Sequence, residues 1–118
     1  MTTLVIGASQ NPMRYSHKAV KRLREHDIEV VAIGKRETTI EDVNVVKSKP
    51  NIDNLHTVTL YLNAQNQEEY INYILSQKPK RIIFNPGTYN QKLIDLAESA
   101  GIETIEDCTL IMLASDSY

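Results

Sequence analysis

The chain has 118 residues, of which 42% are hydrophobic and 24% are charged. This length and composition predict one packed domain, residues 1–118, because a second folding unit has no room. The 13 Lys and Arg residues nearly balance the 15 Asp and Glu residues, and the formal net charge is -2. The chain therefore has no overall positive charge that would attract nucleic acid or an anionic membrane, and any anion-binding site must be a local group of residues.

The start of the chain and its few Cys and His residues exclude further classes. The apolar run at residues 4–6 is too short for a signal peptide or a membrane span, which predicts a cytoplasmic protein. Cys108 has no second cysteine to pair with, in agreement with a reducing compartment, and we expect a packed or partly buried thiol. His17, His26 and His56 have no partners at helical spacing, so no metal site is expected.

The first part of the chain has the pattern of a strand, a helix and a second strand. Residues 4–6 form a continuous apolar run that ends at Gly7, as in a strand buried on both faces. After a loop, Ser16 is predicted to cap a helix whose apolar residues recur at helical spacing. The β-branched run at residues 29–33 closes at Gly34 and completes a βαβ unit, which predicts two parallel strands.

The rest of the chain continues the alternation of strands and helices. We expect Asn90 to cap the helix that precedes Gly101, and Gly101 to occupy the position after that helix. The tail at residues 115–118 is expected to be loose. The predicted elements are a hairpin at 38–40 and 43–46, a turn at Pro50, strands at 57–62, 81–84 and 103–105, and helices at 67–76, 90–100 and 109–114.

This alternation predicts a single α/β domain of the doubly wound, Rossmann-like class. We expect a mainly parallel sheet of about five strands, with helices on both faces. In such sheets, ligands bind beyond the carboxyl ends of the strands, where the strand order reverses. The candidate loops are therefore those that follow residues 6, 33 and 84.

The first of these loops has the composition of a phosphate site. Small residues allow the backbone to approach a ligand, and amides at the start of the next helix point toward it. Arg14 adds a guanidinium fork that suits phosphate oxygens. The loop lacks both the three-glycine dinucleotide fingerprint and the phosphate-loop Lys-Ser/Thr pair. The same small residues would equally suit a turn that serves packing alone. The candidate residues in this loop are Gly7, Ala8, Ser9, Asn11, Arg14, Tyr15 and Ser16.

The other two loops add candidate contacts. Gly34, Lys35 and Arg36 follow the second strand, where basic residues favour a ribose phosphate, although a solvated surface pair is the alternative. Pro86 and Gly87 predict a tight turn near a ligand, with hydrogen bonds from Asn85 and Thr88. The alternative is a plain strand-to-helix turn before the helix cap at Asn90.

No catalytic constellation is visible in the sequence. Ser9 has no histidine placed by sequence to activate it, and no nucleophile-elbow pattern surrounds it. We therefore expect a binding protein and not an enzyme.

Several of these motifs together resemble a known family. The strings Val-Ile-Gly-Ala-Ser at 5–9, Asn-Pro at 11–12, Arg-Tyr-Ser at 14–16, Asn-Pro-Gly at 85–87 and Asp-Cys-Thr-Leu at 107–110 are similar to those of the CoA-binding domain family. Its stand-alone members are counterparts of the N-terminal CoA-binding domain of the succinyl-CoA synthetase α subunit. The likeness extends from residue 4 to about residue 113.

The resemblance implies a ligand and its placement. Residues 7–9, 11 and 14–16 would line the pyrophosphate end of coenzyme A, and the loop after the second strand would meet the adenosine portion. Two positions depart from the family pattern. Many relatives have Asn-Pro where this chain has Gly34-Lys35-Arg36, so a 3′-phosphate contact is inferred from charge alone. Tyr89 stands where relatives commonly have Glu.

The sequence thus leaves three functional hypotheses. The first is a non-catalytic binding or regulatory module for coenzyme A or an acyl-CoA, with a protein partner possible. The second is an enzyme or enzyme subunit that uses an NAD(P)-type dinucleotide. The third is an interaction domain whose nucleotide site is vestigial.

Overall fold

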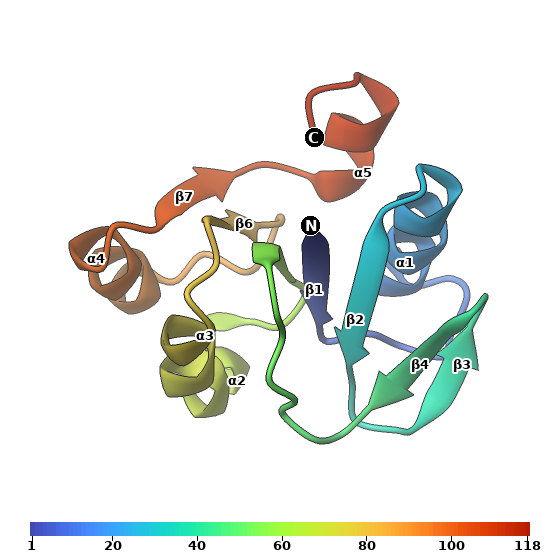
Figure 1. Ribbon diagram of the computed structural model, residues 1–118, viewed down its shortest axis with the longest axis horizontal. Helices are drawn as coiled ribbons and strands as arrows, with labels where there is room; N and C mark the ends of the chain where they lie inside the picture. Colours follow the sequence, from blue (N-terminus) through green and yellow to red (C-terminus); the bar gives the residue numbers. More distant parts are fainter.

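Strands and helices alternate along the chain in the computed structural model, which describes residues 1–118 (Figure 1). The strands are β1 (Thr2–Ile6), β2 (Glu29–Ile33), β3 (Thr38–Ile40), β4 (Val43–Val46), β5 (Leu55–Leu60), β6 (Arg81–Phe84) and β7 (Glu103–Glu106). The helices are α1 (Tyr15–Glu25), α2 (Ala64–Gln67), α3 (Ile71–Gln77), α4 (Gln91–Ser99) and α5 (Thr109–Ala114), and a 3-10 turn, Glu68–Tyr70, joins α2 to α3.

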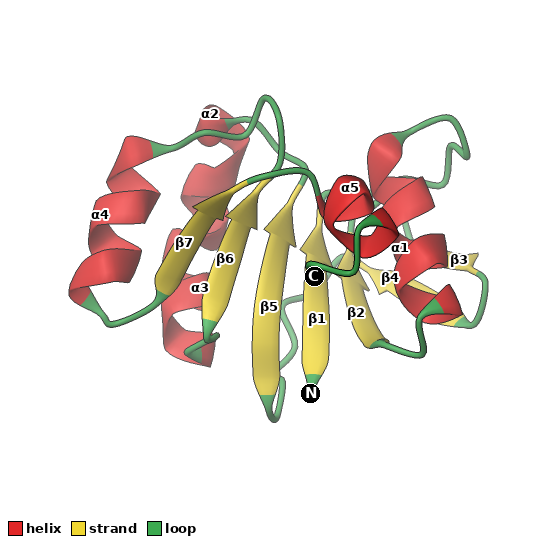
Figure 2. Cartoon of the chain, turned by 90° about the horizontal axis from the view of Figure 1, so that it is seen from above, coloured by secondary structure: helices red, strands yellow, loops and turns green.

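All seven strands form one sheet in the order β3-β4-β2-β1-β5-β6-β7. Only β3 and β4 pair antiparallel, and the arrowheads of β1, β2, β5, β6 and β7 point to one edge in Figure 2. The predicted number of about five strands is too low. The predicted hairpin is present, but β4 also pairs parallel with β2, which adds the hairpin to the main sheet. The fold class is confirmed as Rossmann-like.

The sheet is covered on both faces because its central strand alternates between two cores. Leu4 and Ile6 belong to the larger core with α3 and α4, whereas Val5 belongs to the smaller core with α1 and α5. In Figure 1, α1 and α5 lie above the sheet, and α2, α3 and α4 lie below it. Every residue of β1 is buried, as the continuous apolar run predicts for a central parallel strand.

Two helix starts differ from the prediction. Arg14 is the N-cap residue of α1, and Ser16 is already inside the helix, because a turn from Asn11 to Arg14 leads the chain in earlier. The helix predicted at residues 67–76 begins at residue 64, since the side-chain oxygen of Asn63 accepts the amide of Asn66 at 2.9 Å. The predicted cap of α4 is confirmed, since Asn90 accepts the amide of Leu93.

The tail at residues 115–118 is held by hydrogen bonds to α5 and by Tyr118, which contacts the sheet, so the prediction of a loose end is wrong. The Tyr118 hydroxyl hydrogen-bonds to Thr3, and the guanidinium of Arg81 lies 4.5 Å from the centre of the Tyr118 ring. The amide of Ser117 also donates to Met112 at 2.8 Å. A terminal aromatic residue can bury its ring on the sheet, and this contact outweighs the polar character of the preceding residues.

Candidate functional site

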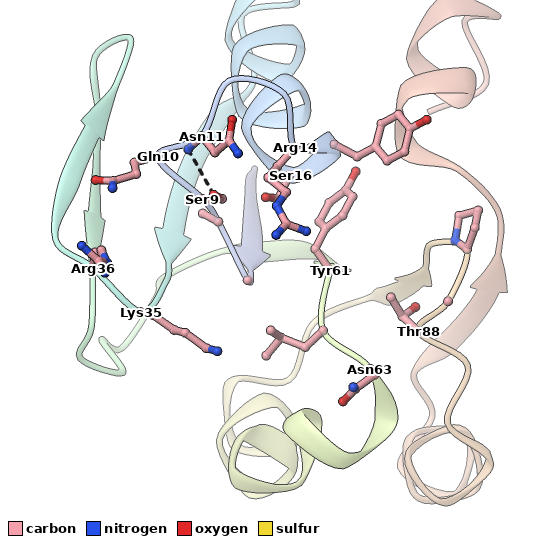
Figure 3. Close-up of a pocket in the computed structure, with 16 residues that line it drawn as sticks. Ser9, Gln10, Asn11, Arg14, Ser16, Lys35, Arg36, Tyr61, Asn63 and Thr88 are labelled. Atoms are coloured by element: carbon pink, nitrogen blue, oxygen red, sulfur yellow. Dashed lines mark hydrogen bonds between the residues drawn. The ribbon is translucent and has the colours of Figure 1, made fainter.

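The crossover direction of the chain reverses between β1 and β5. After β1, the strands β2 and β4 are added on one side of the sheet. After β5, the strands β6 and β7 are added on the opposite side. The amide of Tyr61 donates to Ile6 at 2.9 Å, which holds the two loops leaving β1 and β5 side by side. A cavity of about 640 Å³ opens at this point (Figure 3). This is the position at which doubly wound sheets bind ligands.

The loop after β1 is anchored to the end of β2. The amides of Gly7 and Ala8 both donate to the carbonyl of Ile33 at 2.9 Å. Gly34 has no room for a side chain, because an added Cβ would lie 2.3 Å from the carbonyl oxygen of Ala8. Gly7 itself has φ +97°, a left-handed conformation that favours glycine. The small residues of this loop therefore serve close packing at its base.

The remainder of the loop holds its own shape. Ser9 Oγ accepts the amide of Asn11 at 3.1 Å, and Asn11 Oδ1 accepts the amide of Met13 at 3.0 Å. The ring of His17 donates from Nδ1 to the carbonyl of Ser9 at 2.9 Å. The acceptor groups of the predicted residues Ser9 and Asn11 thus support the loop, while the Ser9 hydroxyl hydrogen and the Asn11 amide group stay available as donors.

Hydrogen-bond donors without a protein acceptor gather where the loop enters α1. Because Gly7 and Ala8 donate to Ile33, the free amides lie further along the chain. They belong to Ser9, Gln10, Tyr15, Ser16 and His17. The first amides of a helix carry the positive end of its dipole, so this arrangement suits an anion.

The charged residues of the cavity are all cationic. Arg14, Lys35 and Arg36 line it, and no Asp or Glu does. None of the three belongs to an ion pair, because the ion pairs of the protein involve other residues. All three side chains are exposed. The cavity therefore has a positive field without an internal counter-ion, which favours a polyanionic ligand.

The loop after β6 contributes Pro86, Gly87 and Thr88 to the cavity, but not Asn85. Asn85 is 3% exposed, and its Nδ2 donates to Thr59 Oγ1 at 2.7 Å and to the carbonyl of Leu60 at 2.9 Å. Its Oδ1 accepts the amide of Thr109 at 2.9 Å. This residue, predicted to contact the ligand, instead ties β5 and α5 to the loop.

Gln67 gives the same loop a second buried support. Its Nε2 donates to the carbonyls of Leu62 and Thr88, at 2.8 and 2.7 Å, and its Oε1 accepts Asn90 Nδ2 at 3.0 Å. Gln67 is completely buried. The walls that the β5 and β6 loops contribute to the cavity are thus held by satisfied polar contacts.

The sequence prediction missed one wall of the cavity, which Tyr61, Leu62 and Asn63 form, and it missed Gln10 in the first loop. Thr88, predicted as a hydrogen-bonding group near the ligand, does line the cavity. The prediction assigned residues 57–62 to a strand, whereas β5 ends at Leu60 and releases Tyr61 and Leu62 into the loop. Asn63 was a usable signal, since a capping residue directly before a helix marks the carboxyl edge of the sheet.

A second cavity of about 460 Å³ adjoins the first. The two share Gly7, Lys35 and Leu62, and the predicted residue Gly34 lines only the second. Polar residues of α2 and the 3-10 turn complete its lining, namely Gln65, Asn66, Glu68, Glu69 and Tyr70. A ligand longer than one cavity can therefore extend from one to the other past Lys35.

Tyr61 has an unusual ionisation. Its phenol oxygen is buried and has no hydrogen-bond partner, and burial raises the pKa of Tyr61 to about 12. Between pH 10 and 12 the folded protein retains a proton that the unfolded chain has lost, so this group makes stability fall as pH rises. The slope that one such group contributes is up to about 1.4 kcal/mol per pH unit.

We expect Tyr61→Phe to remove this slope and to leave stability at pH 7 unchanged or slightly higher, since the lost hydroxyl has no partner. Urea unfolding at pH 7, 10 and 11.5 would measure both effects. The tyrosinate absorbance of the variant should also lack the last-titrating tyrosine. A loss of more than about 1 kcal/mol at pH 7 would show that the hydroxyl makes a stabilising contact.

The strand order and the crevice at the crossover reversal define an α/β protein of the Rossmann type, and its cationic, donor-rich loop suits an anionic ligand. The model of the CoA binding domain family matches residues 1–114, and the chain belongs to this family. The resemblance seen in the sequence is thereby confirmed.

Solved structures agree with this assignment. A crystal structure of an uncharacterized protein is 41% identical, with a TM-score of 0.95, and the match covers 99% of this chain and 97% of that one. A Thermus thermophilus protein, cell-free ID.343, shares the fold at 16% identity and a TM-score of 0.84, covering 99% of this chain and 90% of that one.

A larger protein contains the same fold. This is the dinucleotide forming acetyl-coenzyme A synthetase 1 of Ca. Korarchaeum cryptofilum, solved with phosphate and ADP, at 13% identity and a TM-score of 0.72. The match covers 90% of this chain and 25% of that chain. The search of curated proteins found no match. No helix of this protein is long and apolar enough to cross a membrane, and no three His, Cys, Asp or Glu side chains are grouped to hold a metal ion.

Proposed function

We propose that the protein binds coenzyme A, free or acylated, in the crevice between the ends of β1 and β5. The observation that carries this proposal is the cationic cavity, with Arg14, Lys35 and Arg36 and no carboxylate, joined to the free amides at the start of α1. A diphosphate offers acceptors for both the amides and the guanidinium. Membership of the CoA binding domain family supports the same ligand.

The two joined cavities accommodate the two ends of such a ligand. The diphosphate is assigned to the first loop and Arg14, and the adenosine portion to the second cavity, whose Asn66 and Gln65 amides can hydrogen-bond a base edge. The pantetheine arm then leads past Tyr61 and toward Pro86 and Gly87. This placement uses every loop that the reversal point brings together.

We assign the protein a binding or regulatory role without chemistry. The first cavity has no His, Cys, Asp or Glu in its lining, so no imidazole, thiol or carboxylate lies next to the ligand there. A module of this kind would act through whatever protein reads its ligand-bound state. A measurable thioesterase or transferase activity of the purified protein would contradict this part of the proposal.

Isothermal titration of the purified protein with coenzyme A tests the ligand, and Arg14→Gln tests the site. We expect the substitution to weaken binding by about 10- to 100-fold, because a hydrogen bond to a charged group contributes roughly 1.5–3 kcal/mol. Arg22→Gln is the matched control, since Arg22 is an exposed arginine of α1, the helix that Arg14 caps, and lies outside the cavity. No heat with the unsubstituted protein, or equal affinities for the two variants, would overturn the assignment.

A nicotinamide dinucleotide is the second candidate, because the strand order is that of dinucleotide-binding folds. The first loop reads Gly7-Ala8-Ser9 and then Gln10-Asn11, without the second and third glycines of the dinucleotide fingerprint. Titration of NADH fluorescence distinguishes the two ligands. A change with NADH and no heat with coenzyme A would favour the dinucleotide, and no response to either would favour a vestigial site.

A further inference from the structure

The two basic residues that follow β2 point to different places. Lys35 lines both cavities, whereas Arg36 lines only the first. In Figure 3, Lys35 extends toward the middle of the site, while Arg36 lies on its outer side, as does Gln10 from the first loop. The paired sequence Lys35-Arg36 therefore does not form one patch of charge.

Arg36 makes no ion pair, neither with the adjacent, exposed Glu37 nor with the acidic residues of the hairpin that follows. Asp42 pairs with Arg24 at 2.8 Å, and Glu41 pairs with Lys21 at 3.7 Å. Arg36 itself has neither an ion pair nor a hydrogen bond to another side chain. The side chain of Gln10 is likewise exposed and makes no hydrogen bond in the protein.

Hydrogen bonds hold the backbone close to both side chains. Gly34, two residues before Arg36, is buried and its amide donates to Val46 at 2.9 Å. Gln10 lies between Ser9 and Asn11, which are joined by the hydrogen bond from the Asn11 amide to Ser9 Oγ. Both side chains therefore project from segments whose neighbouring residues are hydrogen-bonded within the protein.

We propose that Gln10 and Arg36 form an outer anion subsite for a phosphate group carried on the ribose of the nucleotide, separate from Lys35. A ligand that spans both cavities must pass Lys35 at their junction. Lys35 therefore contacts a part of the ligand that is present with or without the ribose phosphate. A group that branches from the ribose reaches the side of the crevice near the end of β2, where doubly wound proteins use Arg for ribose phosphates. This inference rests on the proposed function and explains how the site would select a 3′-phosphate.

Isothermal titration with coenzyme A and dephospho-CoA tests the subsite, because the two ligands differ only in the ribose phosphate. We expect the unsubstituted protein to prefer coenzyme A by roughly tenfold or more, as for one charged contact. Arg36→Gln should reduce that preference to about twofold or less, and Gln10→Ala should reduce it in the same direction by a smaller factor. Lys35→Gln should weaken both ligands and keep the preference, and Arg22→Gln should change neither affinity.

The outcomes distinguish the subsite from the proposed function. Equal affinity of the unsubstituted protein for the two ligands would overturn the subsite and leave the proposed function standing. No binding of either ligand would overturn both. A preference that survives Arg36→Gln but disappears in Lys35→Gln would move the ribose phosphate to Lys35 and overturn the assignment to Gln10 and Arg36.

Discussion

Gly34→Ala is expected to reduce the affinity for coenzyme A by more than about tenfold and to lower the free energy of unfolding by about 1–3 kcal/mol. The added Cβ would lie 2.3 Å from the carbonyl oxygen of Ala8 and 3.0 Å from Val45 Cγ1. Backbone cannot rotate away as a flexible side chain can, so the loop after β1 must move by several tenths of an ångström. That loop carries the amides and Arg14 on which the proposed binding depends.

Urea unfolding and titration with coenzyme A measure the two effects separately. Gly101→Ala is the control, because Gly101 has φ +80° but no atom within 4 Å of an added Cβ. It should also lose stability, by about 1–2 kcal/mol of backbone strain, and it should keep its affinity. Unchanged affinity in Gly34→Ala would mean that the position of the first loop does not control binding.

Asn85→Ala is expected to lower the free energy of unfolding by about 2–4 kcal/mol. The substitution leaves the buried amide of Thr109, the carbonyl of Leu60 and the hydroxyl of Thr59 without one of their partners. Water cannot readily replace the lost contacts, since Asn85 and both threonines are almost completely buried. Urea unfolding at neutral pH gives the difference directly.

Two further substitutions make this measurement specific. Asn44→Ala removes an exposed asparagine whose side chain accepts one hydrogen bond, from Thr39 at 3.3 Å, and should change stability by no more than about 0.5 kcal/mol. Asn85→Asp keeps an acceptor for Thr109 but has no Nδ2 to donate, and should also be destabilised. A stability of Asn85→Ala within 0.5 kcal/mol of the unsubstituted protein would contradict the role assigned to the buried amide.

Most of the fold could be predicted because its signals are local. Apolar runs that end at Gly7 and Gly34 mark the two strands of the first βαβ unit, and Asn90 marks the start of α4. The limits of β5 could not be predicted in the same way. Nearly all of its residues are buried, so no alternation marks its ends, and its register is set by pairing with β1, in which Thr3 lies opposite Thr57 and Leu4 opposite Val58. The extent of that strand is decided by a partner distant in the sequence.

The candidate site, like the fold, could be predicted where its signals are local in the sequence. Small residues after a strand, followed by Arg14 and then by Lys35-Arg36 after the next strand, are local patterns, and the structure places all of them around one crevice. Asn85 illustrates the limit. An asparagine after a strand can donate to a ligand or to the protein, and the choice depends on Thr59 and Thr109, which are far from it in the chain.

The sequence by itself therefore determined the fold class, the family, the small residues and arginine of the first loop, and the presence of basic residues after the second strand. The tertiary structure alone decided that β4 extends the sheet beside β2, that Tyr61 and Leu62 form a wall of the site, that Asn85 faces inward, and that Lys35 and Arg36 point apart. The division has a physical reason. Backbone conformation and burial period follow from neighbouring residues, whereas a side chain's direction and its hydrogen-bond partner are set by whatever distant segment packs against it.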